Sequence, residues 1–239
     1  MTRSNGRASR DAEAARRRPR ATPRNADGAA LRARRLRAIA RRLSRSHARM
    51  RALVARIGPP NVLVTPDPFI ALTGSIIHQQ ISMSAARSVR RRLSDRCPRG
   101  RWTPGAILAL DDGELRACGL SRQKVGYVRN IAQAFAGGAV RRASLRRMAD
   151  EAVIETVTRI KGVGRWTAEM LLIFSLERED VWPVGDLGLR RAIQLFFELP
   201  AAPSPVQALS AGEIFRPVRS YATWYLWRSL EAPVAPGIA

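Results

Sequence analysis

Apolar side chains recur every three or four positions over most of this chain, which is typical of helices that bury one face. The pattern predicts a long helix over residues 31–57, ended by Gly58-Pro59-Pro60, and another directly after Asp67-Pro68. Capping residues mark further helix ends: Ser82, Thr103, Asp111 or Asp112, Ser121 and Asp150 as starts, and Gly119 and Gly137-Gly138 as stops. Strand-like alternation is nearly absent, apart from an extended piece at residues 61–65, and Pro-rich stretches at 200–205 and 233–236 indicate a loop and a frayed end. We therefore predict an all-α fold.

The charge of the chain is strongly basic and unevenly distributed. Lysine and arginine number 42 against 19 acidic residues, a formal net charge of +23, and residues 1–50 alone hold 16 arginines and three acids. Residues 1–28 lack apolar periodicity and predict a disordered basic arm, because they bury too little surface to offset the entropy of ordering. Residues 29–239 form the predicted folded domain. A phosphate-binding arm and an incidental tail both stay open, because the scarcity of lysine also indicates codon bias.

Composition excludes several classes of protein. No apolar run reaches the roughly 18 residues of a membrane span, and the Arg-rich start lacks the apolar stretch of a secretory signal, so we expect an intracellular protein without membrane contact. Two cysteines, Cys97 and Cys118, cannot supply the four thiolates of an iron–sulfur cluster, and two histidines leave little for zinc. We therefore expect chemistry without a metal or an organic cofactor. We also expect a monomer, because no heptad seam is evident.

The most informative segment covers residues 153–174, where two helical patterns flank the turn Gly162-Val163-Gly164. Glycines one residue apart permit positive φ and leave bare amides at the start of the second helix, where a DNA phosphate can bind the N–H groups and the helix dipole. On its own this turn is more often only a structural connection. About 20 residues later, Asp186 precedes a predicted helix over residues 187–197, and on sequence alone it is best interpreted as the N-cap of that helix.

The hairpin, followed by a Gly/Pro-rich loop and an aspartate, resembles the helix-hairpin-helix-GPD superfamily of DNA glycosylases. Residues 160–168, residues 183–188 and residues 216–222 with Trp227 are most similar to the 3-methyladenine DNA glycosylase II branch. Residues 75–82 match a fourth segment of the family, so the resemblance covers about residues 62–231. It implies two interleaved helical subdomains with a cleft between them.

The resemblance assigns Asp186 a catalytic role that is compatible with capping. Breaking a base–sugar bond develops oxocarbenium-like positive charge, which a carboxylate stabilises, and the same group can orient or deprotonate the attacking water. The two contributions stay open. Bifunctional relatives carry a nucleophilic lysine two residues after the second hairpin glycine, where this chain has Trp166. The chain is therefore predicted to be a monofunctional glycosylase that leaves an abasic site.

The resemblance also implies residues for base recognition and DNA binding. An alkylated purine carries positive charge and stacks well on electron-rich rings, whereas a wedge residue, here Gln80, fills the space left by the flipped base. Residues 221–227 carry aromatic side chains around most of a helix, so about half of these side chains should only pack in the core. His78 can equally be a structural histidine, and Gln79-Gln80 can equally be a polar pair at a helix end. The implied base pocket holds Trp166, Trp227, His78 and Tyr221, and the implied DNA contacts are Gln79, Gln80, Gly162, Val163, Gly164, Arg165 and Thr167.

The sequence thus predicts an enzyme of base excision repair that flips alkylated purines of the 3-methyladenine type out of double-stranded DNA and hydrolyses the N-glycosidic bond. We expect it in the cytoplasm, associated with a bacterial-type nucleoid, with a monovalent cation at the hairpin as the one ion that the resemblance implies. Two alternatives stay open. One is a non-catalytic helix-hairpin-helix DNA-binding module in which Asp186 is only a cap, and the other is a glycosylase for deaminated or oxidised bases.

Overall fold

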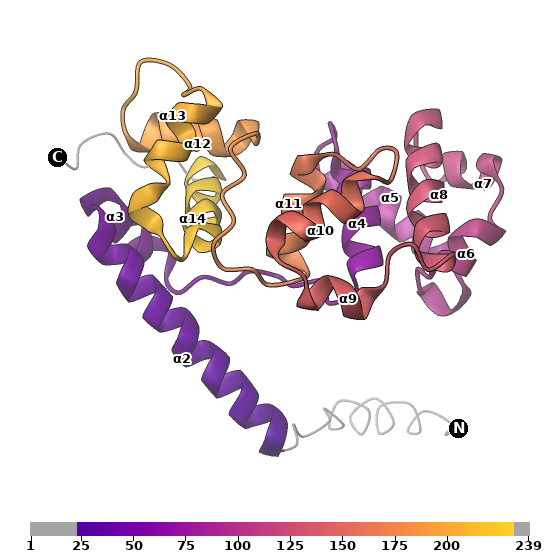
Figure 1. The fold of residues 1–239 in the computed structure, drawn as a ribbon, viewed down its shortest axis with the longest axis horizontal. Coiled ribbons are helices and arrows are strands. Elements are labelled where there is room, and N and C mark those ends of the chain that lie inside the picture. Colours follow the sequence, from indigo (N-terminus) through magenta and orange to yellow (C-terminus); the bar gives the residue numbers. More distant parts are fainter. Residues whose placement is uncertain (1–22, 232–239) are drawn as a thin grey trace, which may run out of the picture.

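The computed structural model describes residues 23–231, which form helices and connecting segments without a β-strand in this range (Figure 1). The all-α prediction is confirmed. The helices form two lobes (Figure 1). The terminal lobe contains α2 (Pro23–Ser46), α3 (Ala48–Ile57), α12 (Leu187–Phe196), α13 (Pro205–Ala211), η2 (Glu213–Phe215) and α14 (Arg219–Glu231). The central lobe contains α4 (Pro68–His78), α5 (Met83–Arg96), η1 (Pro98–Gly100), α6 (Pro104–Ala109), α7 (Asp112–Ala117), α8 (Arg122–Ala136), α9 (Arg142–Arg147), α10 (Asp150–Thr158) and α11 (Arg165–Phe174).

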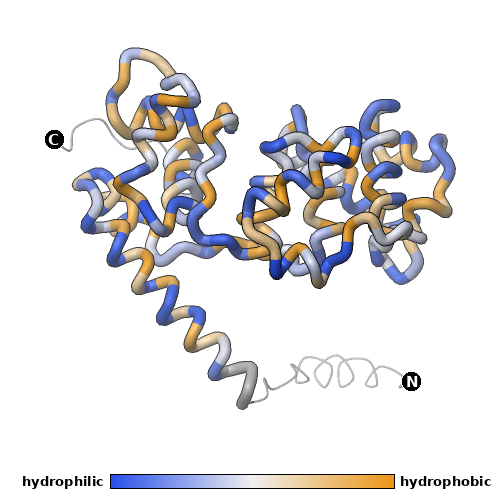
Figure 2. The backbone as a smooth tube through the Cα atoms, viewed as in Figure 1, coloured by the Kyte–Doolittle hydropathy of each residue, from blue (hydrophilic) through white to orange (hydrophobic). Residues whose placement is uncertain are grey.

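Each lobe has its own hydrophobic core. The central core is built around fully buried side chains such as Phe69, Leu72 and Ile131, and the terminal core around Met50 and Tyr225. Figure 2 shows hydrophobic and hydrophilic positions interspersed along the helices, as expected where one face of a helix is buried. Because the first and the last helices share the terminal lobe, the chain crosses between the lobes at residues 58–67 and again at residues 175–186 (Figure 1).

The predicted caps position most of the helices. Side-chain oxygens of Asp67, Ser82, Thr103 and Ser121 accept backbone N–H groups at the starts of α4, α5, α6 and α8, and Asp111 forms a full capping box on α7. Asp150 is the first residue of α10, as predicted, although Ala149 is its N-cap. One predicted boundary shifts, because α13 begins at Pro205, capped by Ser204, so the predicted loop ends one residue earlier. Residues 233–236 lie outside the described range.

The N-terminal predictions need two corrections. The single helix predicted over residues 31–57 is wrong, because His47 adopts an extended conformation, its Nδ1 accepts the Arg49 N–H at 3.2 Å, and α3 starts afresh. The His47 ring also packs on Phe196 and Phe197, a contact between distant parts of the chain. In addition, α2 begins at Pro23, so residues 23–28 of the predicted disordered arm are helical. Residues 1–22 lie outside the described range.

The second crossing segment is fixed against α14 before it reaches residue 186. The Arg219 guanidinium donates to both carboxylate oxygens of Asp180, at 2.8 Å and 3.0 Å, and the Arg219 side chain is only 10% exposed. The Ser220 N–H donates to the Glu179 carbonyl, and its hydroxyl accepts the Val181 N–H at 2.9 Å. This network fixes the loop that carries Asp186 relative to α14, the helix that carries Trp227.

Candidate active site and nucleic-acid interface

The hairpin between α10 and α11 depends on one of its two glycines. Gly162 has φ +103°, which side-chain-bearing residues rarely adopt, whereas Gly164 has an extended conformation at φ −91°. A Cβ atom at Gly162 would lie 2.2 Å from the Tyr127 ring, whereas nothing lies within 4 Å of one at Gly164. The expectation that both glycines serve for positive φ thus applies only to Gly162. Gly164 leaves open space at the start of α11.

The start of α11 presents backbone N–H groups without a side-chain cap. Gly164 is the N-cap and offers no side chain, so the N–H groups of the first turn have no intrahelical acceptor. Val163 is buried in the central core and anchors the turn, and the Asn130 amide donates to the Lys161 carbonyl at 3.0 Å. The hairpin thus presents a fixed set of backbone amides, the groups through which helix N-termini bind anions. The side chain of Val163 is unavailable for DNA contact.

Asp186 lies at the N-terminus of α12, where three donors converge on its half-buried carboxylate. Oδ1 accepts the Leu189 N–H at 2.5 Å, which is the predicted cap, and the Trp227 indole N–H at 2.9 Å. Oδ2 accepts the Trp166 indole N–H at 2.7 Å. Asp186 therefore caps the helix and also presents an oriented negative charge.

The two indoles come from different lobes and meet at this carboxylate. Trp166 is the second residue of α11, directly after the hairpin, and Trp227 lies on α14. Phe174 stacks on Trp227 with ring centroids 6.0 Å apart and an interplanar angle of 17°. A Cβ atom at Gly188, the second residue of α12, would lie 3.1 Å from Asp186 Oδ1 and 3.5 Å from the Trp227 ring, so this glycine makes room for the cluster. The boundary between the lobes thus holds one acid between two half-buried indoles.

Glu169 is a buried carboxyl group that the sequence analysis did not single out. It lies one turn after Arg165 on α11, is 5% exposed, and approaches the Arg165 guanidinium to 3.3 Å. Burial raises the pKa of Glu169 to about 7, the Arg165 charge acts against this shift, and the charges of Glu151 and Asp186 add to it. The charge of Glu169 therefore interacts with that of Asp186.

Arg165 makes these ion pairs instead of standing free for DNA. Its guanidinium also donates to the Glu151 carboxylate at 2.5 Å and 3.1 Å, and these hydrogen bonds to Glu151 raise the pKa of Arg165. The side chain remains 58% exposed, so a phosphate can still approach it. A DNA contact by Arg165 would therefore share or replace the Glu151 pair.

The predicted wedge loop connects α4 to α5 and is held by hydrogen bonds from α8 and to α11. Gln80 is exposed at its tip with φ +57°, a conformation that few residues other than glycine adopt. The Gln79 amide donates to the Thr167 hydroxyl on α11 at 3.2 Å. Lys124, on α8, donates to the Ile77 carbonyl at 2.9 Å and to the Gln79 carbonyl at 2.6 Å. The buried Thr167 side chain thus supports the loop, and its DNA contact could only be made through its N–H group.

Lys124 is a positioning residue that sequence reasoning missed. We expect Lys124→Met to lower the free energy of unfolding by about 1–3 kcal/mol, because hydrogen bonds from a charged donor to the last carbonyls of α4 are lost. Base release should slow more on a paired lesion than on an unpaired one, because a loose wedge fails to hold the duplex open. Thermal unfolding and single-turnover release on both duplexes measure the two effects. Arg122→Gln on the same exposed turn of α8 is the control, and equal losses in the two variants would refute the positioning role.

Two predicted pocket residues have other contacts. The His78 ring bonds through Nδ1 to the Gly74 carbonyl of its own helix at 2.9 Å, which is the simpler structural interpretation. Tyr221 donates its hydroxyl to Glu179 at 3.1 Å and lines a small cavity with Val62 and Ile173. Six residues along a helix rotate by about 240°, so Tyr221 and Trp227 face different directions. The structure does not bring Tyr221 to Asp186.

The remaining aromatic residues of α14 divide as the helical geometry predicts. Tyr225 is fully buried and donates its hydroxyl to the Gly58 carbonyl at 2.6 Å, so it belongs to the core. Trp224 packs against the Tyr225 ring and lies under the Arg228 guanidinium. Only Trp227 points to the carboxylate.

Between residues 23 and 231, no three His, Cys, Asp or Glu side chains gather into a metal-binding group, and no helix combines the length and hydrophobicity of a membrane span.

A helical hairpin with bare amides, followed by an oriented carboxylate at the start of a second helix, defines the class of helix-hairpin-helix DNA repair proteins. Residues 73–217 match the family described as HhH-GPD superfamily base excision DNA repair protein, and the chain belongs to this family. The matched range includes the hairpin, the wedge loop and Asp186.

Individual relatives agree with this assignment. The chain is 36% identical over 183 residues to DNA-3-methyladenine glycosylase 1 of Schizosaccharomyces pombe, covering 76% of this chain and 80% of that protein. The structure of a 3-methyladenine DNA glycosylase of the same yeast in complex with abasic DNA is similar at a TM-score of 0.77 and 34% identity, covering 84% of this chain and 99% of the other. A DNA-3-methyladenine glycosidase of Bacillus halodurans gives a TM-score of 0.70 at 29% identity, with 81% and 89% covered.

Proposed function

We propose that this protein is a monofunctional DNA glycosylase of base excision repair that removes alkylated purines of the 3-methyladenine type. The observation that carries the proposal is the Asp186 carboxylate, held by the indole N–H groups of Trp166 and Trp227 directly beside the hairpin. The relatives support the same class, because their names state glycosylase activity on 3-methyladenine in DNA.

The steps follow from the charges at the site. Phosphates of one DNA strand bind the amides at the start of α11, and the damaged nucleotide rotates out of the helix while Gln80 fills its place. The base departs with the electron pair of the glycosidic bond. Asp186 stabilises the positive charge that grows on the sugar, and water then adds to the anomeric carbon and loses a proton. A base that is already cationic leaves more readily and stacks on the indole rings of Trp166 and Trp227.

Hydrolysis without a covalent intermediate follows from the position of the amines. Trp166 takes the place where a lysine nucleophile would attack the sugar. Lys124 is held under the wedge loop by two carbonyl groups, and burial lowers its pKa. The product is therefore an abasic site in an uncut strand.

The implied monovalent cation fits the donor set of the hairpin. Hard cations prefer oxygen ligands, and the turn offers backbone carbonyl groups, among them those of Lys161 and Gly162. The Lys161 carbonyl already accepts the Asn130 amide, and an oxygen with two lone pairs retains capacity for a second partner. Such an ion would add positive charge beside the docked phosphate.

We propose that the protein acts as a monomer on double-stranded DNA, in the cytoplasm of a bacterial-type cell and associated with its nucleoid.

A base-release assay tests the proposed function. We expect free base from duplexes that contain 3-methyladenine or 7-methylguanine, strand cleavage only after alkali treatment, and no protein–DNA adduct on borohydride reduction, because Trp166 stands in place of the lysine nucleophile. Duplexes with 1,N6-ethenoadenine, hypoxanthine or 8-oxoguanine define the range of bases. Release restricted to hypoxanthine or 8-oxoguanine would replace the alkylated substrate with a deaminated or oxidised one. DNA binding without any release would leave only a binding module.

A further inference from the structure

Helix α2 carries a row of arginines that the site described above does not use. Arg34, Arg37, Arg41 and Arg45 follow one another at spacings of three, four and four residues, so they lie on one face of the helix. The row extends over about 16 Å at 1.5 Å per residue. All four side chains are exposed, and none makes a hydrogen bond, ion pair or ring contact with a residue that the structure describes. We call this set the arginine row.

Other arginines on the same helix do have partners. Arg35 binds the Glu179 carboxylate at 3.0 Å, Arg32 approaches Glu177 at 3.6 Å, and Arg42 donates to the Arg216 carbonyl at 3.0 Å. These three face the rest of the protein, as do the buried Ile39 and Leu43. The arginine row lies on the opposite side, so intramolecular packing does not account for it.

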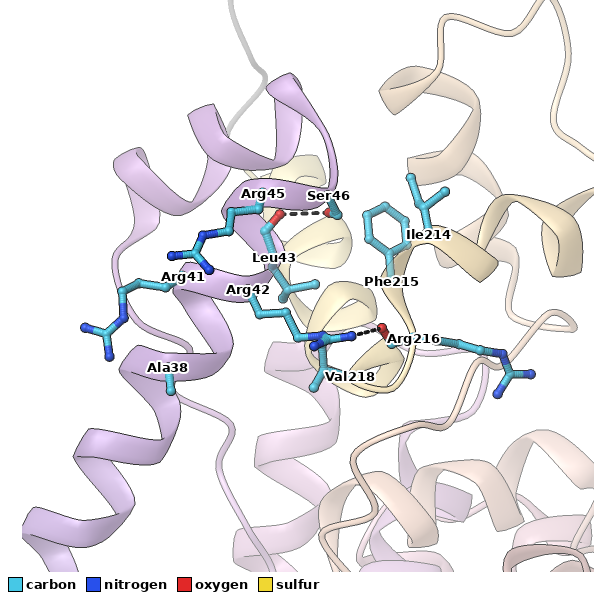
Figure 3. A pocket seen from close by; sticks show the side chains of 10 residues that line it. All are labelled: Ala38, Arg41, Arg42, Leu43, Arg45, Ser46, Ile214, Phe215, Arg216 and Val218. Atoms are coloured by element: carbon cyan, nitrogen blue, oxygen red, sulfur yellow. Dashed lines mark hydrogen bonds between the residues drawn. The ribbon is translucent and has the colours of Figure 1, made fainter.

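The arginine row lowers the stability of α2. Arg37 and Arg41, and Arg41 and Arg45, are like charges four residues apart, which destabilises a helix. Figure 1 shows α2 extending beyond the other helices of the terminal lobe, and among the helices it packs mainly on α3 and η2. In Figure 3, Arg41 and Arg45 point away from η2, beside a hollow that Ile214 and Phe215 also line. A row of exposed, unpaired charges on an extended helix is the surface expected for a polyanion.

The charge pattern favours a phosphate backbone over an acidic protein. Guanidinium groups bind phosphates through two parallel hydrogen bonds, and each DNA strand presents a charge every 3.4 Å, or about five over the length of the row. Protein interfaces need an apolar centre, but between Arg34 and Arg45 no other residue falls within the helical angle that the row spans, and the two nearest to its edges, Ala38 and Ser44, are small. We propose that the arginine row is a second contact surface for duplex DNA, on the other lobe from the hairpin. The choice of duplex DNA rests on the proposed function.

Salt dependence of DNA binding tests this proposal. Wild type, the variant R34Q/R37Q/R41Q/R45Q and the charge-matched control R99Q/R101Q/R116Q/R147Q are titrated with an undamaged 40-base-pair duplex over a range of KCl concentrations. The control removes four exposed arginines of the central lobe, so both variants lose the same net charge. Glutamine has nearly the helix propensity of arginine, and circular dichroism verifies that α2 remains folded.

Each phosphate contact contributes about 0.9 to the slope of log affinity against log salt. We expect the row variant to reduce this slope by about 3 to 4 and the affinity at 0.1 M salt by at least about tenfold, with the control clearly less affected. Single-turnover excision at saturating enzyme should match the wild type in both variants. An unchanged slope in the row variant, or an equal reduction in the control, would overturn the proposal and leave an acidic protein as the partner. Failure of wild-type excision would instead refute the proposed function.

Discussion

The variant Asp186→Asn should lose at least about three orders of magnitude in the rate of base excision while it still binds duplex DNA. One preorganised electrostatic contact to a developing charge contributes about 10²–10³ in rate, and here a full negative charge facing the cationic sugar is removed. Asparagine caps helices as well as aspartate does, so α12 should persist. Removing a negative charge beside the phosphates leaves affinity for abasic DNA equal or higher. Single-turnover release and fluorescence anisotropy measure the two properties separately.

The hydrogen bonds at Asp186 predict a secondary effect of this substitution. An asparagine oxygen can replace Oδ1 and keep the bonds from the Leu189 and Trp227 N–H groups, but its NH₂ group then faces the Trp166 indole N–H, donor against donor. We expect a loss of about 1–2 kcal/mol in unfolding free energy. Asp111→Asn makes the same change at another N-cap and should leave excision unaltered. Wild-type excision by D186N would refute catalysis by this carboxylate and leave it only as a cap.

Local features of the fold could be predicted because their causes are local in the sequence. Asp67, Thr103 and Ser121 cap their helices through hydrogen bonds that span only two or three residues, and the composition of each turn determines them. The break at His47 could not be predicted in the same way. The apolar pattern continues through it, and its ring contacts Phe196 and Phe197 about 150 residues later.

The site residues likewise divide into those that the sequence could predict and those that depend on contacts between distant parts of the chain. Family resemblance identified Asp186, Trp166 and Trp227, and the structure shows how they meet through two indole hydrogen bonds. Lys124 could not be singled out from the sequence, because it contacts wedge-loop carbonyls that precede it by 45 and 47 positions in the chain. Glu169 could have been recognised from the sequence as an unusual buried acid, because it is the one acidic residue within the apolar run of α11.

Comparing an alanine substitution at each of the two hairpin glycines distinguishes the stability of the turn from its contact with DNA. We expect Gly162→Ala to lower the free energy of unfolding by about 2–5 kcal/mol, because the new Cβ atom meets the Tyr127 ring at 2.2 Å and φ +103° is strained for alanine. Gly164→Ala should change stability by less than about 1 kcal/mol, because φ is ordinary and the space is open. Its affinity for duplex DNA should still fall, because the methyl group occupies the approach to the amides. Urea unfolding and anisotropy measure both variants.

A double variant protects this prediction against a simple failure to fold. Tyr127→Leu combined with Gly162→Ala removes the ring that the new Cβ atom meets, so it should recover part of the lost stability, and the remainder reports the strain of positive φ. Absence of any recovery would mean that the Tyr127 contact does not select glycine at position 162. Wild-type DNA affinity in Gly164→Ala would mean that no phosphate approaches the backbone there. The hairpin would then be a structural turn, and the arginines of the surface would have to account for DNA binding.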